Sequence, residues 1–106
     1  MHERDWCYMH HDIVVQWNKY ADRDLAVSKH LLTMHPKPLE VITFHCQQAA
    51  EKYLKGFLIS KGVEEPPKTH NLDTLCSLCA EYDDRFKEII RECSSLTQYD
   101  VQPRSP

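Results

Sequence analysis

The stretch FHCQQAAEKYLKGFLISKGVEEPPKTHNLDTL, from Phe44 to Leu75, decides the fold of this 106-residue chain. It predicts an amphipathic helix, a stop at Gly62, a loop around two adjacent prolines, and the capped start of another helix. The first of these helices should run from about residue 39 to 61. Its main apolar face follows helical spacing and consists of Ile42, Cys46, Ala49, Ala50, Tyr53, Leu54, Phe57 and Leu58.

A second, mixed stripe on the same helix holds Val41, Phe44, Gln48, Lys55 and Ile59. Phe44 and Ile59 are expected to point nearly opposite the main core face. A helix with apolar residues on two sides is often enclosed from both. We therefore expect a second subunit to cover this stripe, with Val41, Phe44 and Ile59 as interface residues.

Three further helical segments are expected. One runs from about residue 10 to 34 and is stopped by Pro36 and Pro38. Another starts at Asn71, whose side chain can cap the free amides of the first turn. A last one starts near Asp83 or Asp84. Because the connections are short, the segments predict an all-α, antiparallel up-and-down bundle of four helices, or five if another helix follows.

Asp24 falls in the middle of the apolar stripe of the first helix, which includes Trp17 and Ala21. An isolated buried charge is very costly, so this carboxylate must be paired or hydrogen-bonded. The candidate partners are Lys52, Tyr53 and Tyr99.

The composition is that of an ordinary soluble globular chain, with 42% hydrophobic and 27% charged residues. A chain of this length forms one domain, residues 1–106, and buries only about two-thirds of its unfolded surface, so a partner chain would add stability. The net charge of −3 gives no global attraction to nucleic acid. No apolar run is long enough for a membrane span and the polar N-terminus is no signal peptide, so we expect a cytoplasmic protein.

Metal and cofactor sites are not expected. Five cysteines is an odd count, and Cys76 and Cys79 form a C-x-x-C at core-facing helical positions, where packing is the simpler explanation. His2, His10 and His11 cluster near the N-terminus, but a fraying terminal turn is a poor scaffold for a metal.

Basic residues gather along one flank of the second helix, where His45, Lys52 and Lys55 lie with Gln48. Lys61 and Lys68 frame the loop that leads to His70. Such a stripe is suited to a phosphate or an RNA backbone. A solvated lysine face explains it equally well, and the sequence leaves both interpretations open.

The chain resembles a HEPN domain, the small helical domain named for higher eukaryotes and prokaryotes nucleotide-binding. Four segments carry the resemblance: Ala21-x-x-Asp24-Leu25, the run FHCQQAAEKYLK at 44–55, Thr69-His70-Asn71-Leu72, and Tyr99-x-x-x-Pro103-Arg104-Ser105-Pro106. The last resembles the family's Tyr…Arg-Tyr-Pro segment with Ser105 in place of the aromatic residue. The resemblance covers about residues 13–106.

This resemblance implies an all-α bundle that tends to dimerise. The prokaryotic branch it is most similar to is often paired with a minimal nucleotidyltransferase. The family usually continues into another helix, whereas this chain stops at Pro106. We therefore expect either a truncated chain or a shorter member, in which apolar surface is left for a partner.

Another branch of the family consists of RNases, which carry an Arg and a His a few residues apart late in the chain. Arg104 is followed by no His here. Arg4 with His10, and Arg23 with His30, have a similar spacing but lie in the wrong part of the fold. The sequence therefore gives little support to an RNase.

The leading hypothesis is a non-catalytic, dimeric HEPN binding module that contacts a nucleotide or a nucleotidyltransferase partner, in a toxin–antitoxin-like pair. The alternatives are a metal-independent endoribonuclease, with His45 or His70 as general base and Arg104 stabilising charge, and a scaffold without a ligand. The residues expected to bind the ligand are Gln48, Lys52, Lys55, Lys68, His70, Asn71 and Arg104.

Overall fold

The computed structural model describes the backbone of residues 3–88 and the side chains of residues 11–88. It contains α1 (Glu3–Leu31), α2 (Leu39–Ser60) and α3 (Leu72–Ala80), and residues 86–88 are again helical. No strand occurs within residues 3–88, so the prediction of an all-α fold is confirmed. The expected roles of Tyr99 and Arg104, and the side chains of His2 and His10, lie outside the described residues.

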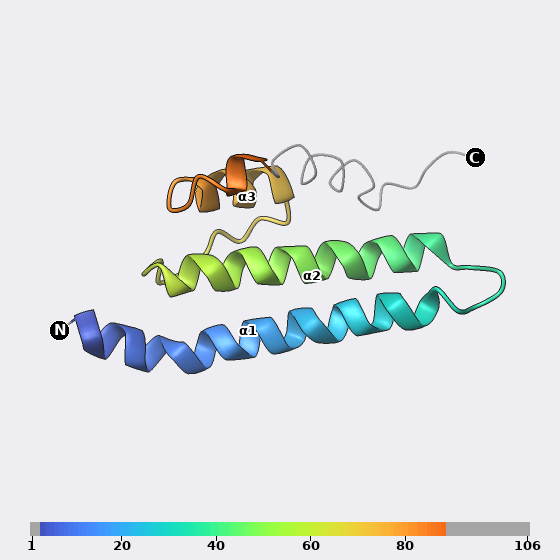
Figure 1. The fold of residues 1–106 in the computed structure, drawn as a ribbon, viewed down its shortest axis with the longest axis horizontal. Helices are drawn as coiled ribbons and strands as arrows, with labels where there is room; N and C mark the ends of the chain where they lie inside the picture. The colour runs from blue at the N-terminus through green and yellow to red at the C-terminus, as the bar shows by residue number, and fades with distance from the viewer. Residues whose placement is uncertain (1–2, 89–106) are drawn as a thin grey trace.

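The arrangement is a long helical hairpin with a short helix on one side (Figure 1). Helices α1 and α2 run antiparallel, and α3 packs against α2 over its C-terminal half. Because the fourth helix is described only at 86–88, the full up-and-down topology stays a prediction. Within residues 3–88, no helix combines the length and apolar character that crossing a membrane requires.

Helix α1 starts at Glu3, several residues before the expected start, because residues 3–9 contain no proline or glycine to stop it. Helix α1 ends at Leu31, a few residues before the predicted end near Met34. Beyond it, the Thr33 and Met34 amides donate to the carbonyls three residues back, as in a 3₁₀ turn. The loop up to Pro38 follows, and α2 then begins at Leu39, as the sequence predicted.

The end of α2 has the hydrogen-bond pattern of a Schellman motif. The amide of Gly62 donates to Ile59 O at 3.0 Å, and that of Val63 donates to Leu58 O at 3.1 Å. Gly62 has a φ of 96°, which L side chains rarely adopt. Val63 then packs against the core cluster that contains Leu58. The predicted stop at Gly62 is confirmed.

Small residues let α1 and α2 approach closely. A Cβ added at Gly56 of α2 would lie only 3.1 Å from Cβ of Trp17 on α1. Ala21 and Ala49 are fully or almost fully buried. Nearer the hairpin loop, the Ser28 hydroxyl of α1 lies 3.3 Å from the carbonyl oxygen of Ile42 on α2 and donates across the seam.

The other side of α2 packs against α3. The buried cluster consists of Leu54, Leu58, Leu72, Leu75, Cys76 and Cys79. The Cys79 thiol donates to the backbone carbonyl of Leu54 at 3.5 Å, and burial together with the nearby Cys76 raises its pKa to about 12. The prediction that both thiols of the C-x-x-C pack in the core is confirmed.

Two sides of α2 are thus covered by other helices of this same chain, α1 and α3. Ile59, expected to face a second subunit, is only 3% exposed. Its expected exposure was wrong: Ile59 follows Glu51 and Lys55 at four-residue spacing, on the side of α2 that His70 of the later chain contacts. Val41 and Phe44, near the start of α2, are exposed.

We expect Gly62→Ala to lower the free energy of unfolding by about 1–2 kcal/mol, because alanine must adopt a left-handed backbone there. Asparagine tolerates that conformation better, so Gly62→Asn should lose less. Urea unfolding of the two variants measures both values. Equal losses for the two variants, or no loss, would contradict the assigned role of Gly62.

Candidate functional site

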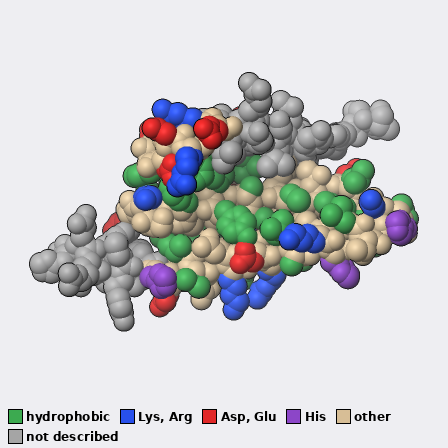
Figure 2. Space-filling view, viewed as in Figure 1, with side chains coloured by type: hydrophobic (Ala, Val, Ile, Leu, Met, Phe, Trp, Pro, Cys, Tyr) green, Lys and Arg blue, Asp and Glu red, His purple; other side chains and the backbone are tan. Residues whose placement is uncertain are grey.

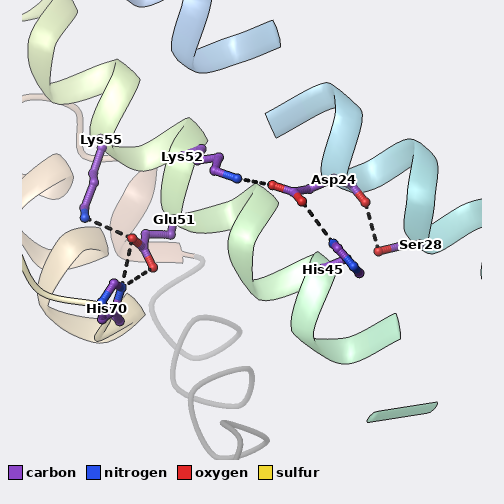
Figure 3. A network of polar contacts seen from close by, with 7 residues as sticks. All are labelled: Asp24, Ser28, His45, Glu51, Lys52, Lys55 and His70. Carbon is purple, nitrogen blue, oxygen red and sulfur yellow. Dashed lines mark hydrogen bonds and ion pairs between the residues drawn. The ribbon is translucent and has the colours of Figure 1, made fainter. Parts of the chain in front are cut away.

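The polar side chains of α2 form two clusters, each built around one carboxylate (Figure 3). In the first, Asp24 of α1 lies between His45 and Lys52 of α2. His45 and Lys52 are two helical turns apart, so they share one face of α2. His45 Nδ1 lies 3.0 Å from Asp24 Oδ1, and the Lys52 ammonium donates to Oδ2. This cluster ties α1 to α2.

Asp24 is 15% exposed and ionised. Burial raises the pKa of its carboxyl, but the hydrogen bonds and positive charges of Lys52 and His45 outweigh this effect and leave the pKa below its ordinary value. Because a carboxylate only accepts hydrogen bonds, His45 must carry its proton on Nδ1. The first cluster is therefore a charge-assisted link between the two long helices.

In the second cluster, Glu51 and Lys55 of α2 are paired one turn apart, with Lys55 Nζ 2.9 Å from Glu51 Oε2. Both side chains are only 10% exposed. His70, in the loop before α3, places Nδ1 2.9 Å from Oε1 and 3.1 Å from Oε2 of the same carboxylate. This cluster ties the start of α3 to α2, on a different side of α2 from Asp24 (Figure 3).

The start of α3 is ordered by local hydrogen bonds. Asn71 Oδ1 accepts from the Thr74 amide at 3.1 Å, as the sequence predicted for a capping residue. The Thr69 hydroxyl oxygen accepts from the Asn71 amide at 3.0 Å. His70 lies between Thr69 and Asn71, the two residues whose side chains accept these hydrogen bonds. Its imidazole contacts Glu51, yet the side chain is 76% exposed.

The structure separates the expected ligand residues into two groups. Lys52 and Lys55 are held in the carboxylate clusters, and Gln48 is half-buried between them. Lys68, His70 and Asn71 are exposed at the start of α3. Arg104 lies outside the described residues.

The sequence named Lys52 as a partner of Asp24, but it did not anticipate the pairing of His45 with Asp24, or of Lys55 and His70 with Glu51. The signal for the first of these was the spacing of seven residues between His45 and Lys52. Tyr53, considered as a partner of Asp24, instead donates to Asp22. Among the described residues, no group of three or more His, Cys, Asp or Glu side chains is arranged to hold a metal ion.

The comparison with known proteins gives one match. A family model described as HEPN domain matches residues 14–106, which is most of the chain. No curated protein and no solved structure matches the chain.

We expect Asp24→Ala to lower the free energy of unfolding by roughly 1–3 kcal/mol, because it leaves Lys52 and His45 without their acceptor. The matched control is Asp12→Ala on the same helix, where the exposed side chain should be replaceable within about 0.5 kcal/mol. Equilibrium unfolding in urea measures both. Similar losses for the two variants would remove the special role of Asp24.

The contribution of Asp24 should also depend on pH. Its pKa in the folded state lies below the ordinary 3.8, so the carboxylate favours folding above about pH 4 and this contribution is lost as the pH falls through the lower, folded-state pKa. The difference in unfolding free energy between wild type and Asp24→Asn should thus be full near pH 6 and shrink steadily below about pH 4. A difference that is unchanged in acid would show that the charge of Asp24 does not matter.

Proposed function

Because the chain belongs to the HEPN domain family, we propose that it is a non-catalytic binding module of this family. In this proposal it forms a homodimer and contacts a nucleotidyltransferase partner, a nucleotide, or both, in a toxin–antitoxin-like pair. The module is of the prokaryotic type associated with minimal nucleotidyltransferases, and it acts in the cytoplasm. The unpaired, buried thiols of Cys76 and Cys79 suit that reducing compartment.

One observation carries the proposal: the basic side chains along α2 are engaged within the fold. Lys52 and His45 are paired with Asp24, and Lys55 with Glu51. A general base or a phosphate contact must be free to meet its substrate. Lys52 and Lys55 are therefore left out of the proposed ligand contacts, and His45 is a poor general base.

Exposed apolar side chains support a protein partner. Leu39, Val41 and Phe44 are exposed at the start of α2, and Leu32 and Met34 are exposed in the loop between α1 and α2. Figure 1 places α3 toward the other end of the hairpin, and Figure 2 shows apolar side chains at the surface among Lys, Asp and Glu. Large apolar side chains gathered near one end of a surface are a feature of protein interaction sites. We assign the homodimer contact to Val41 and Phe44.

The start of α3 supports the nucleotide contact. Lys68, His70 and Asn71 are exposed there, and the first amides of a helix attract a phosphate. Gln48 and Arg104 complete the proposed contacts.

One observation favours the endoribonuclease alternative. His70 combines an exposed imidazole with a buried carboxylate at Nδ1, which is the arrangement of an oriented general base. In that alternative Arg104 would stabilise the developing charge. If neither RNA cleavage nor binding of a nucleotide or a nucleotidyltransferase occurs, a scaffold without a ligand is left.

We expect the wild-type protein to sediment as a dimer at tens of micromolar, roughly the range of weak interfaces. Phe44→Glu should sediment as a monomer, because it places a charge at the centre of the apolar contact. Val15→Glu is the matched control, since Val15 is exposed on α1 but lies outside the proposed contact. A wild-type monomer, or a dimer that Phe44→Glu leaves intact, would contradict the assigned interface.

Pure protein incubated with mixed RNAs should leave them intact, and copurification should instead recover a nucleotide or a nucleotidyltransferase. Gel analysis of the RNA and mass spectrometry of the purified complex make the two measurements. RNA cleavage that His70→Ala abolishes and Val15→Glu retains would replace the binding module with the nuclease.

A further inference from the structure

The contact between His70 and Glu51 fixes where the imidazole carries its proton. Nδ1 faces both oxygens of the carboxylate, at 2.9 and 3.1 Å. The carboxylate is buried and is itself held by Lys55 at 2.9 Å. Because an ionised carboxylate only accepts hydrogen bonds, Nδ1 donates the proton. In the neutral imidazole the lone pair is then on Nε2.

His70 differs from the other described histidines in combining this anchor with exposure. His45 has a similar contact, with Nδ1 3.0 Å from Asp24, but its side chain is only 26% exposed. His30 is exposed, and no carboxylate within the described side chains holds its ring. His70 is 76% exposed and anchored. Its Nε2 is therefore an oriented nucleophile open to solvent.

We propose that His70 is a phosphorylation site, whose Nε2 accepts a phosphoryl group from a donor of the phosphoramidate class. The Nε2 lone pair attacks phosphorus and forms the new N–P bond. The N–P bond of the donor, whose nitrogen is already protonated, breaks, and the neutral amine leaves with that bonding pair. Nδ1 keeps its proton throughout, and Glu51 balances the positive charge that the ring gains.

The surroundings of His70 are suited to the product. Lys68 is exposed two residues earlier, and the first turn of α3 follows, where the helix dipole favours an anion. Glu51 and Asp73 oppose the added charge, and Lys55 neutralises Glu51. His70 is also one of the proposed nucleotide contacts, but its phosphorylation needs neither a dimer nor a nucleotidyltransferase, so the two proposals can fail separately.

The test is chemical phosphorylation of the full chain with potassium phosphoramidate, followed by mass spectrometry that maps phosphohistidine over time. His70 should be modified at least about tenfold faster than His30 and His45 in the same molecule, by analogy with the smallest effects that carboxylate partners have on metal-binding histidines. A rate for His70 no higher than that for His30 would overturn the proposal, and this comparison needs no variant.

Glu51→Gln tests the anchor. It should slow the modification of His70 about tenfold and leave that of the exposed His30 unchanged, which shows that the reagent is active. Thermal unfolding of the variant checks its fold. An unchanged His70 rate in folded Glu51→Gln would show that the carboxylate does not activate the imidazole, and the proposal would be wrong.

Discussion

The pairing of two nearly buried carboxylates with lysine and histidine is the constraint on which the rest of this structure depends. Asp24 must find a partner across the seam between α1 and α2, and Glu51 must find one on the side of α2 that α3 approaches. An unpaired charge at either place would cost more than the neighbouring apolar contacts return. The carboxylates therefore select the register of the hairpin and the placement of the α3 start, while Gly56 and the core leucines supply close packing.

This constraint also shapes the functional conclusion. The same residues that look like a phosphate-binding stripe in the sequence are the ones that neutralise the carboxylates, so most of the positive charge on α2 belongs to the fold. Two features of the surface bear most on function: the apolar side chains near the hairpin loop and the exposed imidazole of His70. The first suits a protein partner. The second is the described histidine best placed for chemistry, and for that reason it carries both the nuclease alternative and the proposed phosphorylation.

Features set by neighbouring residues were predictable from the sequence. The start of α2 after Pro38, the stop at Gly62 and the cap at Asn71 each follow from one residue's backbone or side-chain preference. Features set by distant segments were not. Ile59 is buried on the side of α2 where the distant His70 contacts Glu51, and His45 reaches Asp24 only in the observed helix register. Periodicity along one helix cannot reveal which neighbour covers a given stripe.

The lysines of α2 are structural, and a double-mutant cycle on Glu51 and Lys55 tests this most directly. The free energy of unfolding is measured in urea for wild type, Glu51→Gln, Lys55→Met and the double variant. Both side chains are almost buried, so Glu51→Gln should leave the Lys55 charge unpaired and Lys55→Met should leave Glu51 with His70 alone, and the coupling between the two changes should be about 1–3 kcal/mol. Single effects that add to within about 0.5 kcal/mol would show two independent residues and would contradict the claim.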